Sequence, residues 1–173
     1  MNIYPSFTDI RSHLSHKFFT LRTNARRESL WAKLVGKNTN LANFPEEAPE
    51  KSPNRKFLGT EEIPVEQIVG TISRQSDFDH KFRPRNKHLR ERWVNTYLTL
   101  ERDGWSPILV HKVGDQYFVE DGHHRVSVAR ALGITFLQAR VWEYPCLAKE
   151  PGPCQPAPCP ETSSVHVYAR VTD

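Results

Sequence analysis

The stretch YFVEDGHHRVSVARALG, residues 117–133, decides the fold because it joins a strand pattern directly to a helix pattern. Its first residues are apolar and predict a strand, and residues 124–133 predict a helix that ends at Gly133. Gly122 stands at the junction, where a residue without Cβ permits a left-handed turn and lets the backbone approach a ligand closely. The stretch therefore predicts a strand, a tight turn and a helix N-terminus in direct succession.

Three basic residues, His123, His124 and Arg125, stand at the start of this helix. A helix N-terminus already exposes unpaired N–H groups and a partial positive charge, so cations there are unfavourable unless an anion is close. Asp121 can cap the helix, but one carboxylate cannot also satisfy a guanidinium and two imidazoles. We therefore expect a phosphate bound by Asp121, Gly122 and the three basic residues.

Two alternatives to a phosphate site remain open for the same motif. In the first, the histidines pack inward and Arg125 pairs with Glu120 or Asp121. In the second, His123, His124 and Asp121 bind a metal ion, although adjacent residues at a turn rarely converge on one ion.

A second cluster of charge covers residues 73–93, with Phe78 and Phe82 interleaved among the charged side chains. We expect Arg74, at its start, to join the phosphate site. A loop that folds over an anionic ligand has this composition, and so does a nucleic-acid contact through residues 81–92. The third interpretation is a solvated loop that leads into a helix. The cluster holds the basic residues Arg74, Lys81, Arg83, Arg85, Lys87, Arg90 and Arg92 and the acids Asp77, Asp79 and Glu91.

The flanking segments predict an α+β fold class, a small mixed sheet with helices packed against it. The expected elements are a short strand and turn in residues 61–72, a helix in residues 88–104, two strands in residues 107–121 and a strand in residues 135–144. Gly114-Asp115 is the expected hairpin turn between the two strands of residues 107–121.

Composition divides the chain into a basic helical extension, a linker, a domain and a Pro-rich tail. These segments are expected at residues 1–36, 37–59, 60–145 and 146–173. Residues 1–40 hold seven Lys and Arg against two acids, a net charge of +5, whereas the whole chain carries +4. Such a helix suits nucleic acid or another anionic partner, or is a solvated face. A break near RTNARR, residues 22–27, would divide the extension into two helices.

The remaining features exclude several classes of protein. Cys146, Cys154 and Cys159 lack the close paired spacing of a structural zinc site, and an odd number of cysteines in a Pro-rich tail is a poor disulfide framework, so we expect reduced, incidental thiols. No apolar run approaches the roughly 20 residues that span a bilayer. No apolar stretch follows the N-terminal charges, so no signal peptide is expected and the protein is predicted to be cytoplasmic. The oligomeric state is left open.

Residues 63–143 resemble the ParB N-terminal/sulfiredoxin-like superfamily. The motifs that carry the resemblance are IPVEQIVGTISR, GWSPILVHKVGDQYFVEDGHHRVSVARALG and FLQARVWEY. The resemblance implies a small α+β domain that binds a nucleotide, such as CTP, ATP or ADP, at the turn before the helix, with Mg²⁺ accompanying it. Partition proteins of this superfamily continue into a helix-turn-helix domain, whereas a Pro-rich tail follows Tyr144 here.

The resemblance also bears on catalysis. Sulfiredoxins carry a catalytic Cys where His123 stands here, so sulfiredoxin chemistry is not expected. Free serine kinases of the superfamily carry the same DGHHR motif and take their base from an earlier loop. That resemblance implies Asp77 or Asp79 as the base and assigns His124 to charge neutralisation.

Two functions follow from this interpretation. The first is a nucleotide-binding domain that acts as a switch or a DNA-associated adaptor, with DNA contacts from the N-terminal extension or residues 81–92. The second is a small nucleotide-dependent phosphotransferase.

Overall fold

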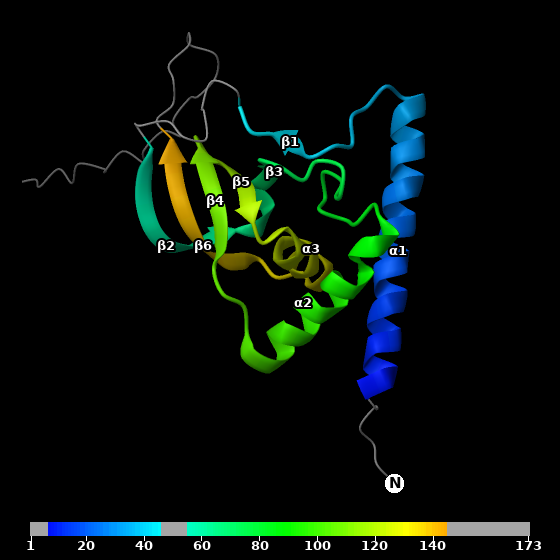
Figure 1. The fold of residues 1–173 in the computed structure, drawn as a ribbon. Coiled ribbons are helices and arrows are strands. Elements are labelled where there is room, and N and C mark those ends of the chain that lie inside the picture. The colour runs from blue at the N-terminus through cyan, green and yellow to red at the C-terminus, as the bar shows by residue number, and fades with distance from the viewer. Residues whose placement is uncertain (1–6, 46–54, 145–173) are drawn as a thin grey trace, which may run out of the picture.

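The computed structural model describes residues 7–45 and 55–144 of the 173-residue chain. These residues form an α+β fold with a mixed sheet and three α-helices (Figure 1). In chain order the elements are α1 (Phe7–Leu34), β1 (Ala42–Asn43), β2 (Lys56–Pro64), η1 (Val65–Gln67), β3 (Ile68–Thr71), η2 (Lys87–Leu89), α2 (Arg90–Asp103), β4 (Ile108–Val113), β5 (Gln116–Asp121), α3 (His123–Leu132) and β6 (Phe136–Tyr144).

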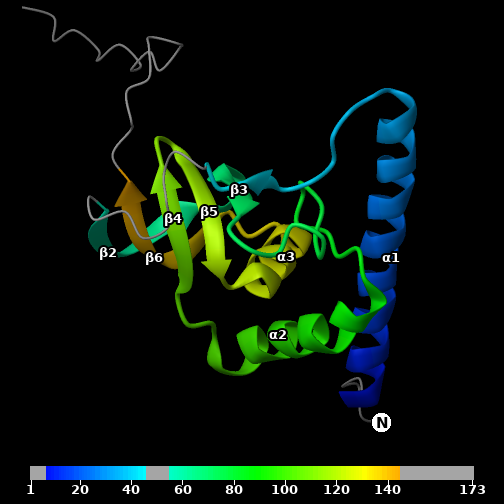
Figure 2. The ribbon, with the colours of Figure 1, turned by 45° about the horizontal axis from the view of Figure 1, so that its top comes forward.

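The strands of the sheet lie in the order β1-β3-β5-β4-β6-β2. Strand β3 pairs in parallel with β1 and β5, and β4 pairs in parallel with β6. The β4–β5 hairpin and the β2–β6 pair are antiparallel. Figures 1 and 2 show α3 and α2 on one side of the sheet, with α1 crossing α2 near the N-terminal end of α2. The β5–α3 junction therefore lies between the sheet and α2.

The core joins all three helices to the sheet. Trp93 of α2 is fully buried, and its indole N–H donates a 3.1 Å hydrogen bond to Oγ of Ser127 in α3. Phe18 of α1 is also fully buried and meets the Trp93 ring edge-on at 6.0 Å between centroids. The helix α1 is therefore packed into the core through the face that carries Phe18, and it contacts α2 there.

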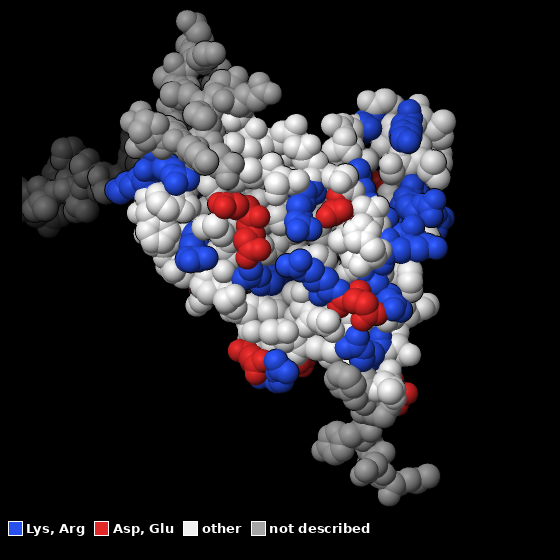
Figure 3. Space-filling view, viewed as in Figure 1, with Lys and Arg blue, Asp and Glu red and all other residues white. Residues whose placement is uncertain are grey.

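The predicted break in the N-terminal helix is wrong, because α1 continues unbroken from Phe7 to Leu34. Residues 22–27 contain neither Gly nor Pro, and Ala25 packs inward with 3% of its surface exposed. Beyond this point a group of large apolar side chains is exposed at the end of the helix and directly after it: Leu30, Trp31, Leu34 and Val35. Figure 3 shows Lys and Arg side chains gathered along the same helix, at the right of the view.

The described part of the segment predicted as a linker, residues 37–45 and 55–59, contains β1 and the start of β2. Strand β1 pairs Ala42 with Gly70 of β3, and Leu41 beside it is 3% exposed. Strand β2 begins at Lys56, so the sheet starts before the expected domain boundary at residue 60. The linker prediction is wrong for these residues because isolated apolar side chains among Asn and Pro gave no strand periodicity.

The helices and strands predicted in residues 88–144 are confirmed. Residues 61–72, predicted as one short strand and a turn, instead contain the end of β2, the 3₁₀ helix η1 and the strand β3. Helix α2 ends before Gly104, which has a φ of 74°, and the β4–β5 hairpin turns at Gly114. The alternation expected in residues 135–144 is present in β6, where Leu137, Ala139 and Val141 are buried. Among the described residues, no helix has the length and apolarity to cross a membrane. The Pro-rich tail and its three cysteines lie outside the described residues.

Candidate functional site at the N-terminus of helix α3

The turn between β5 and α3 has the predicted left-handed conformation. Gly122 has a φ of 106° and a ψ of 16°. A Cβ at this position would lie 2.4 Å from Cγ2 of Ile108, so the turn excludes a side chain on steric grounds as well. Among the described residues no side chain caps α3, and the first helical hydrogen bond runs from Val126 N to Gly122 O at 3.0 Å. The N–H groups of residues 123–125 therefore remain without helical partners.

A small cavity of about 80 Å³ lies at this helix end. It has room for about two or three waters, or for one phosphoryl group. The cavity brings Arg74 together with the 121–125 motif, as the sequence predicts. Its lining consists of Arg74, Arg92, Thr96, Asp121, Gly122, His123, His124 and Arg125.

Two lining residues, Arg92 and Thr96, were not predicted as site residues. Both come from α2, about 30 residues before the motif in sequence. Their spacing of four places them on one helix face, beside the buried Trp93. From the sequence, that spacing predicts that the two side chains share a helix face, but it does not predict that this face lines the cavity at α3.

His124 is the least satisfied polar side chain of the cavity. Its residue surface is 6% exposed, and neither ring nitrogen has a hydrogen-bond partner among the described residues. Burial, together with the charges of Arg92 and Arg74, lowers the pKa of His124 to about 4. The ring is therefore neutral at pH 7. An unpaired buried polar group costs about 1–3 kcal/mol, and a ligand would remove that cost.

His123 is anchored in the fold rather than free. Its Nε2 lies 2.6 Å from Oγ1 of Thr71 in β3, and its ring stacks on Phe78 at 6.2 Å between centroids. Burial, and secondarily the charge of Arg74, lowers the pKa of His123 to about 4. This residue thus follows the inward-packing alternative, with one of its two ring nitrogens already engaged.

Arg125 is held by neighbouring groups of the chain. Its guanidinium forms an ion pair of 2.5 Å with Asp121 and donates to the carbonyl oxygens of Ser106 and Pro107 at 2.6 and 3.0 Å. Asp121 thereby pairs with Arg125 instead of capping the helix. Of the three cations expected at the helix start, only the Arg125 guanidinium is charged at pH 7, and it is paired with Asp121.

Two other arginines supply the positive charge of the cavity. The guanidinium of Arg74 lies 3.3 Å from Asp77, and its backbone N–H donates to Oγ1 of Thr71 at 3.2 Å. Arg92 has an exposed side chain and forms no ion pair with any acid in the described residues. Arg92 is therefore the cation of this cavity that is available to a ligand.

The two carboxylates considered as catalytic bases are both engaged. Asp79 is 1% exposed and accepts hydrogen bonds of 2.8 Å from both the backbone N–H and Nε of Arg83. It does not line the cavity. Asp77 accepts a 3.0 Å hydrogen bond from Asn86 and pairs with Arg74. The 79–83 turn thus uses Asp79 structurally, and Asp77 approaches the cavity only through Arg74.

Within the described ranges, no group of three or more His, Cys, Asp or Glu side chains is arranged to hold a metal ion.

Known proteins offer little similarity to this chain. No protein-family model matches it, and no curated protein is similar to it in sequence. Among solved structures, it is similar to sulfiredoxin from Arabidopsis thaliana with 20% identity and a TM-score of 0.37. The similar region covers 47% of this chain and 82% of that one.

Proposed function

We propose that this protein is a nucleotide-binding domain that holds a phosphoryl group at the N-terminus of α3. The observation that carries the proposal is the His124 ring, which is buried beside a cavity and has no hydrogen-bond partner in the described chain. A phosphoryl oxygen is an acceptor that this imidazole can satisfy.

The surroundings of His124 favour an anion over a neutral ligand. Arg92 and Arg74 bring two guanidinium groups to the cavity, and only Arg74 is paired with an acid. The uncapped N–H groups of α3 add the partial positive charge of a helix N-terminus. A helix end with free N–H groups and two arginines is a suitable phosphate site without a metal cluster supplied by the protein.

A nucleotide is the proposed class of ligand, with CTP, ATP and ADP as the candidates. The cavity accommodates one phosphoryl group, so the rest of the nucleotide would extend over the neighbouring surface. Binding rather than phosphotransfer is proposed because Asp77 and Asp79 both have their oxygens engaged. A base for phosphotransfer needs a carboxylate within hydrogen-bond reach of the acceptor hydroxyl.

The test is a thermal-shift screen of CTP, ATP and ADP with and without Mg²⁺, followed by titration calorimetry of any nucleotide that stabilises the chain. Arg92→Ala should weaken binding by about 1.5–3 kcal/mol, the contribution of a charged hydrogen bond. Arg102→Ala is the matched control, because Arg102 is 78% exposed and pairs with Asp103 at the far end of α2.

Two results would reject the proposal: no nucleotide raises the melting temperature, or Arg92→Ala binds as tightly as wild type. The same samples incubated with free serine distinguish the two functions. Formation of phosphoserine would establish phosphotransfer.

A further inference from the structure

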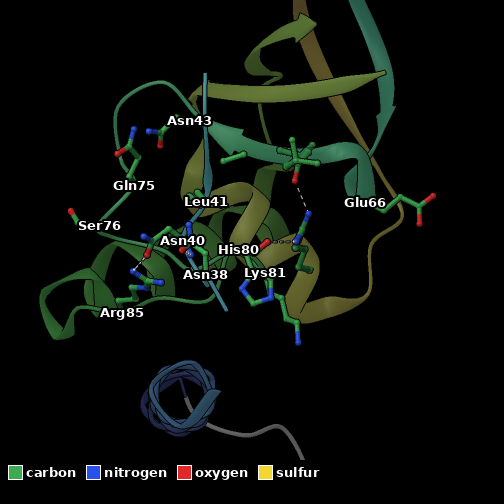
Figure 4. A pocket seen from close by; sticks show the side chains of 14 residues that line it. Asn38, Asn40, Leu41, Asn43, Glu66, Gln75, Ser76, His80, Lys81 and Arg85 are labelled. Carbon is green, nitrogen blue, oxygen red and sulfur yellow. Dashed lines mark hydrogen bonds between the residues drawn. The ribbon is translucent and has the colours of Figure 1, made fainter. Parts of the chain in front are cut away.

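A second, larger cavity lies on the other side of the loop that carries Arg74. Arg74 lines the α3 cavity, whereas the next two residues, Gln75 and Ser76, line a groove of about 1050 Å³ (Figure 4). The opposite wall is the 38–43 segment, which includes β1. This groove is thus built partly by a segment that the sequence predicts as a linker, and it is independent of the proposed phosphate site.

The groove contains an arginine that no carboxylate neutralises. Arg130 of α3 donates to the carbonyl oxygens of Ile68 and Val65 at 2.7 and 3.1 Å and forms no ion pair within the described chain. Burial lowers the pKa of Arg130, with Asp79 as the acid that opposes the shift. Carbonyl oxygens orient the guanidinium but leave its full charge in the groove.

A second arginine is held in the same way at another wall. Arg85 donates to Oδ1 of Asn40 at 2.8 Å and to the carbonyl oxygen of Thr39 at 2.7 Å. It also lacks an ion pair within the described residues. By contrast, Lys81 at the groove is neutralised by Glu28 at 2.9 Å. The two arginines are thus oriented in advance for an anionic ligand.

Polar side chains without partners occupy one end of the groove. Asn43, Gln75 and Ser76 all line the groove, and Figure 4 shows Gln75 and Ser76 on the same loop. None of these three side chains forms a hydrogen bond within the described chain. Buried below them, Leu41 and Ile68 provide an apolar floor.

We propose that this groove binds an extended acidic segment of a partner protein. Guanidinium groups bind carboxylates in a bidentate manner, and side-chain amides pair with the N–H and C=O groups of a peptide. Single-stranded nucleic acid is disfavoured because base stacking needs aromatic platforms. Of the residues that line the groove, only His80 has a ring, and its Nε2 lies 3.4 Å from Glu28.

The test uses a fluorescein-labelled glutamate–serine peptide, with a lysine–serine peptide and an oligo-dT of equal length as competitors. Binding of the full chain is followed by fluorescence polarisation. Asn43→Ala combined with Gln75→Ala should weaken binding about three- to tenfold, because these amides are free to bond the peptide. Gln116→Ala, an exposed residue at the start of β5, is the matched control. Arg85→Gln should weaken binding at least tenfold relative to Arg102→Gln.

A direct readout comes from the side-chain NH₂ signals of Asn43 and Gln75 in amide NMR spectra, assigned from the two single variants. Both signals should shift on addition of the acidic peptide. The proposal is overturned if the acidic peptide shifts neither signal, or if oligo-dT displaces it more effectively than unlabelled peptide does. Because the amide variants remove no hydrogen bond within the described chain, this readout remains valid even if Arg85→Gln unfolds the 38–43 segment.

Discussion

Nε2 of His123 and Oγ1 of Thr71 lie 2.6 Å apart in the buried junction between β3 and α3. The same hydroxyl accepts hydrogen bonds from the backbone N–H groups of Ser73 and Arg74, both at 3.2 Å. One side chain of β3 therefore fixes the first histidine of the helix and the loop that brings Arg74 to the cavity. His124, the next residue, is left to face the cavity without a partner in the described chain.

Thr71→Val should disturb both the fold and the site. The substitution leaves two backbone N–H groups without their acceptor and the His123 Nε2 without its hydrogen-bond partner, which should cost about 1–3 kcal/mol of unfolding free energy. Urea denaturation measures this change. Thr71→Ser keeps the hydroxyl and should recover most of the stability and of the nucleotide affinity. Equal stability of the Val and Ser variants would show that the hydroxyl is not the anchor.

The two buried histidines predict a loss of stability in mild acid. Each has a pKa of about 4 in the folded chain against an ordinary value of 6.5, so the unfolded chain binds protons first as the pH falls. The contribution of the two neutral histidines to the free energy of unfolding is therefore complete above pH 6.5, and it is lost as the pH falls from 6.5 to 4. A shift of this size corresponds to about 3 kcal/mol per histidine.

His124→Phe isolates the contribution of the second ring. Phe retains the edge-on packing against Phe78, which lies 5.3 Å away between centroids. The variant should be at least as stable as wild type at pH 7, lose less stability on acidification and bind nucleotide more weakly. Urea denaturation at several pH values checks the first two expectations. An acid sensitivity identical to that of wild type would contradict the buried, neutral state of His124.

Glu28 is expected to tether α1 to the domain. Hydrogen bonds from Lys81 and Arg83 lower the pKa of Glu28 from 4.5 to about 2. The tether is therefore present above pH 4.5 and lost as the pH falls towards 2. Because the carboxylate is about one-third exposed, Glu28→Gln should cost no more than about 1 kcal/mol. Hydrogen exchange of α1 should accelerate in this variant, whereas it should not change in the control Glu143→Gln, which removes an ion pair between β6 and β4.

An interaction between α1 and DNA would depend on exposed cations of this helix. Arg26, Arg27 and Lys33 have exposed side chains and form no ion pair within the described residues. Changing all three to Gln should reduce the slope of log affinity against log salt by about 2–3, or about 0.9 for each phosphate that is no longer neutralised. Deleting the helix is not a usable test because Phe18 belongs to the core. An unchanged slope in the triple variant would reject this mode of DNA binding.

Much of the fold was predictable because the periodicity within residues 88–144 is strong and local. Gly104, Gly114 and Gly122 stand where turns need positive φ, and the structure has them there. The strand β1 was missed because its two residues pair with β3 almost 30 positions away. Pairing between distant segments leaves little trace in a short polar stretch.

The location of the candidate site was predictable from the sequence, but the charges and ion pairs of its side chains were not. The motif gives the helix N-terminus, yet burial makes His123 and His124 neutral and Asp121 pairs with Arg125. The sequence does not reveal that Arg92 supplies the unpaired cation, because α2 reaches the cavity only through its packing on α3. Burial and tertiary packing determine these charges, and neither is encoded in the motif.

The most direct measurement of the central claim is NMR of protein labelled in its histidine ring nitrogens, recorded from pH 7 to 4 with and without the nucleotide. If a phosphoryl group binds beside His124, the pKa of the His124 ring should rise from about 4 towards or beyond the ordinary histidine value of 6.5. His123, held by Thr71, should respond less. A His124 ring whose signals and pKa are unchanged at saturating nucleotide would contradict the claim that this imidazole faces the bound phosphate.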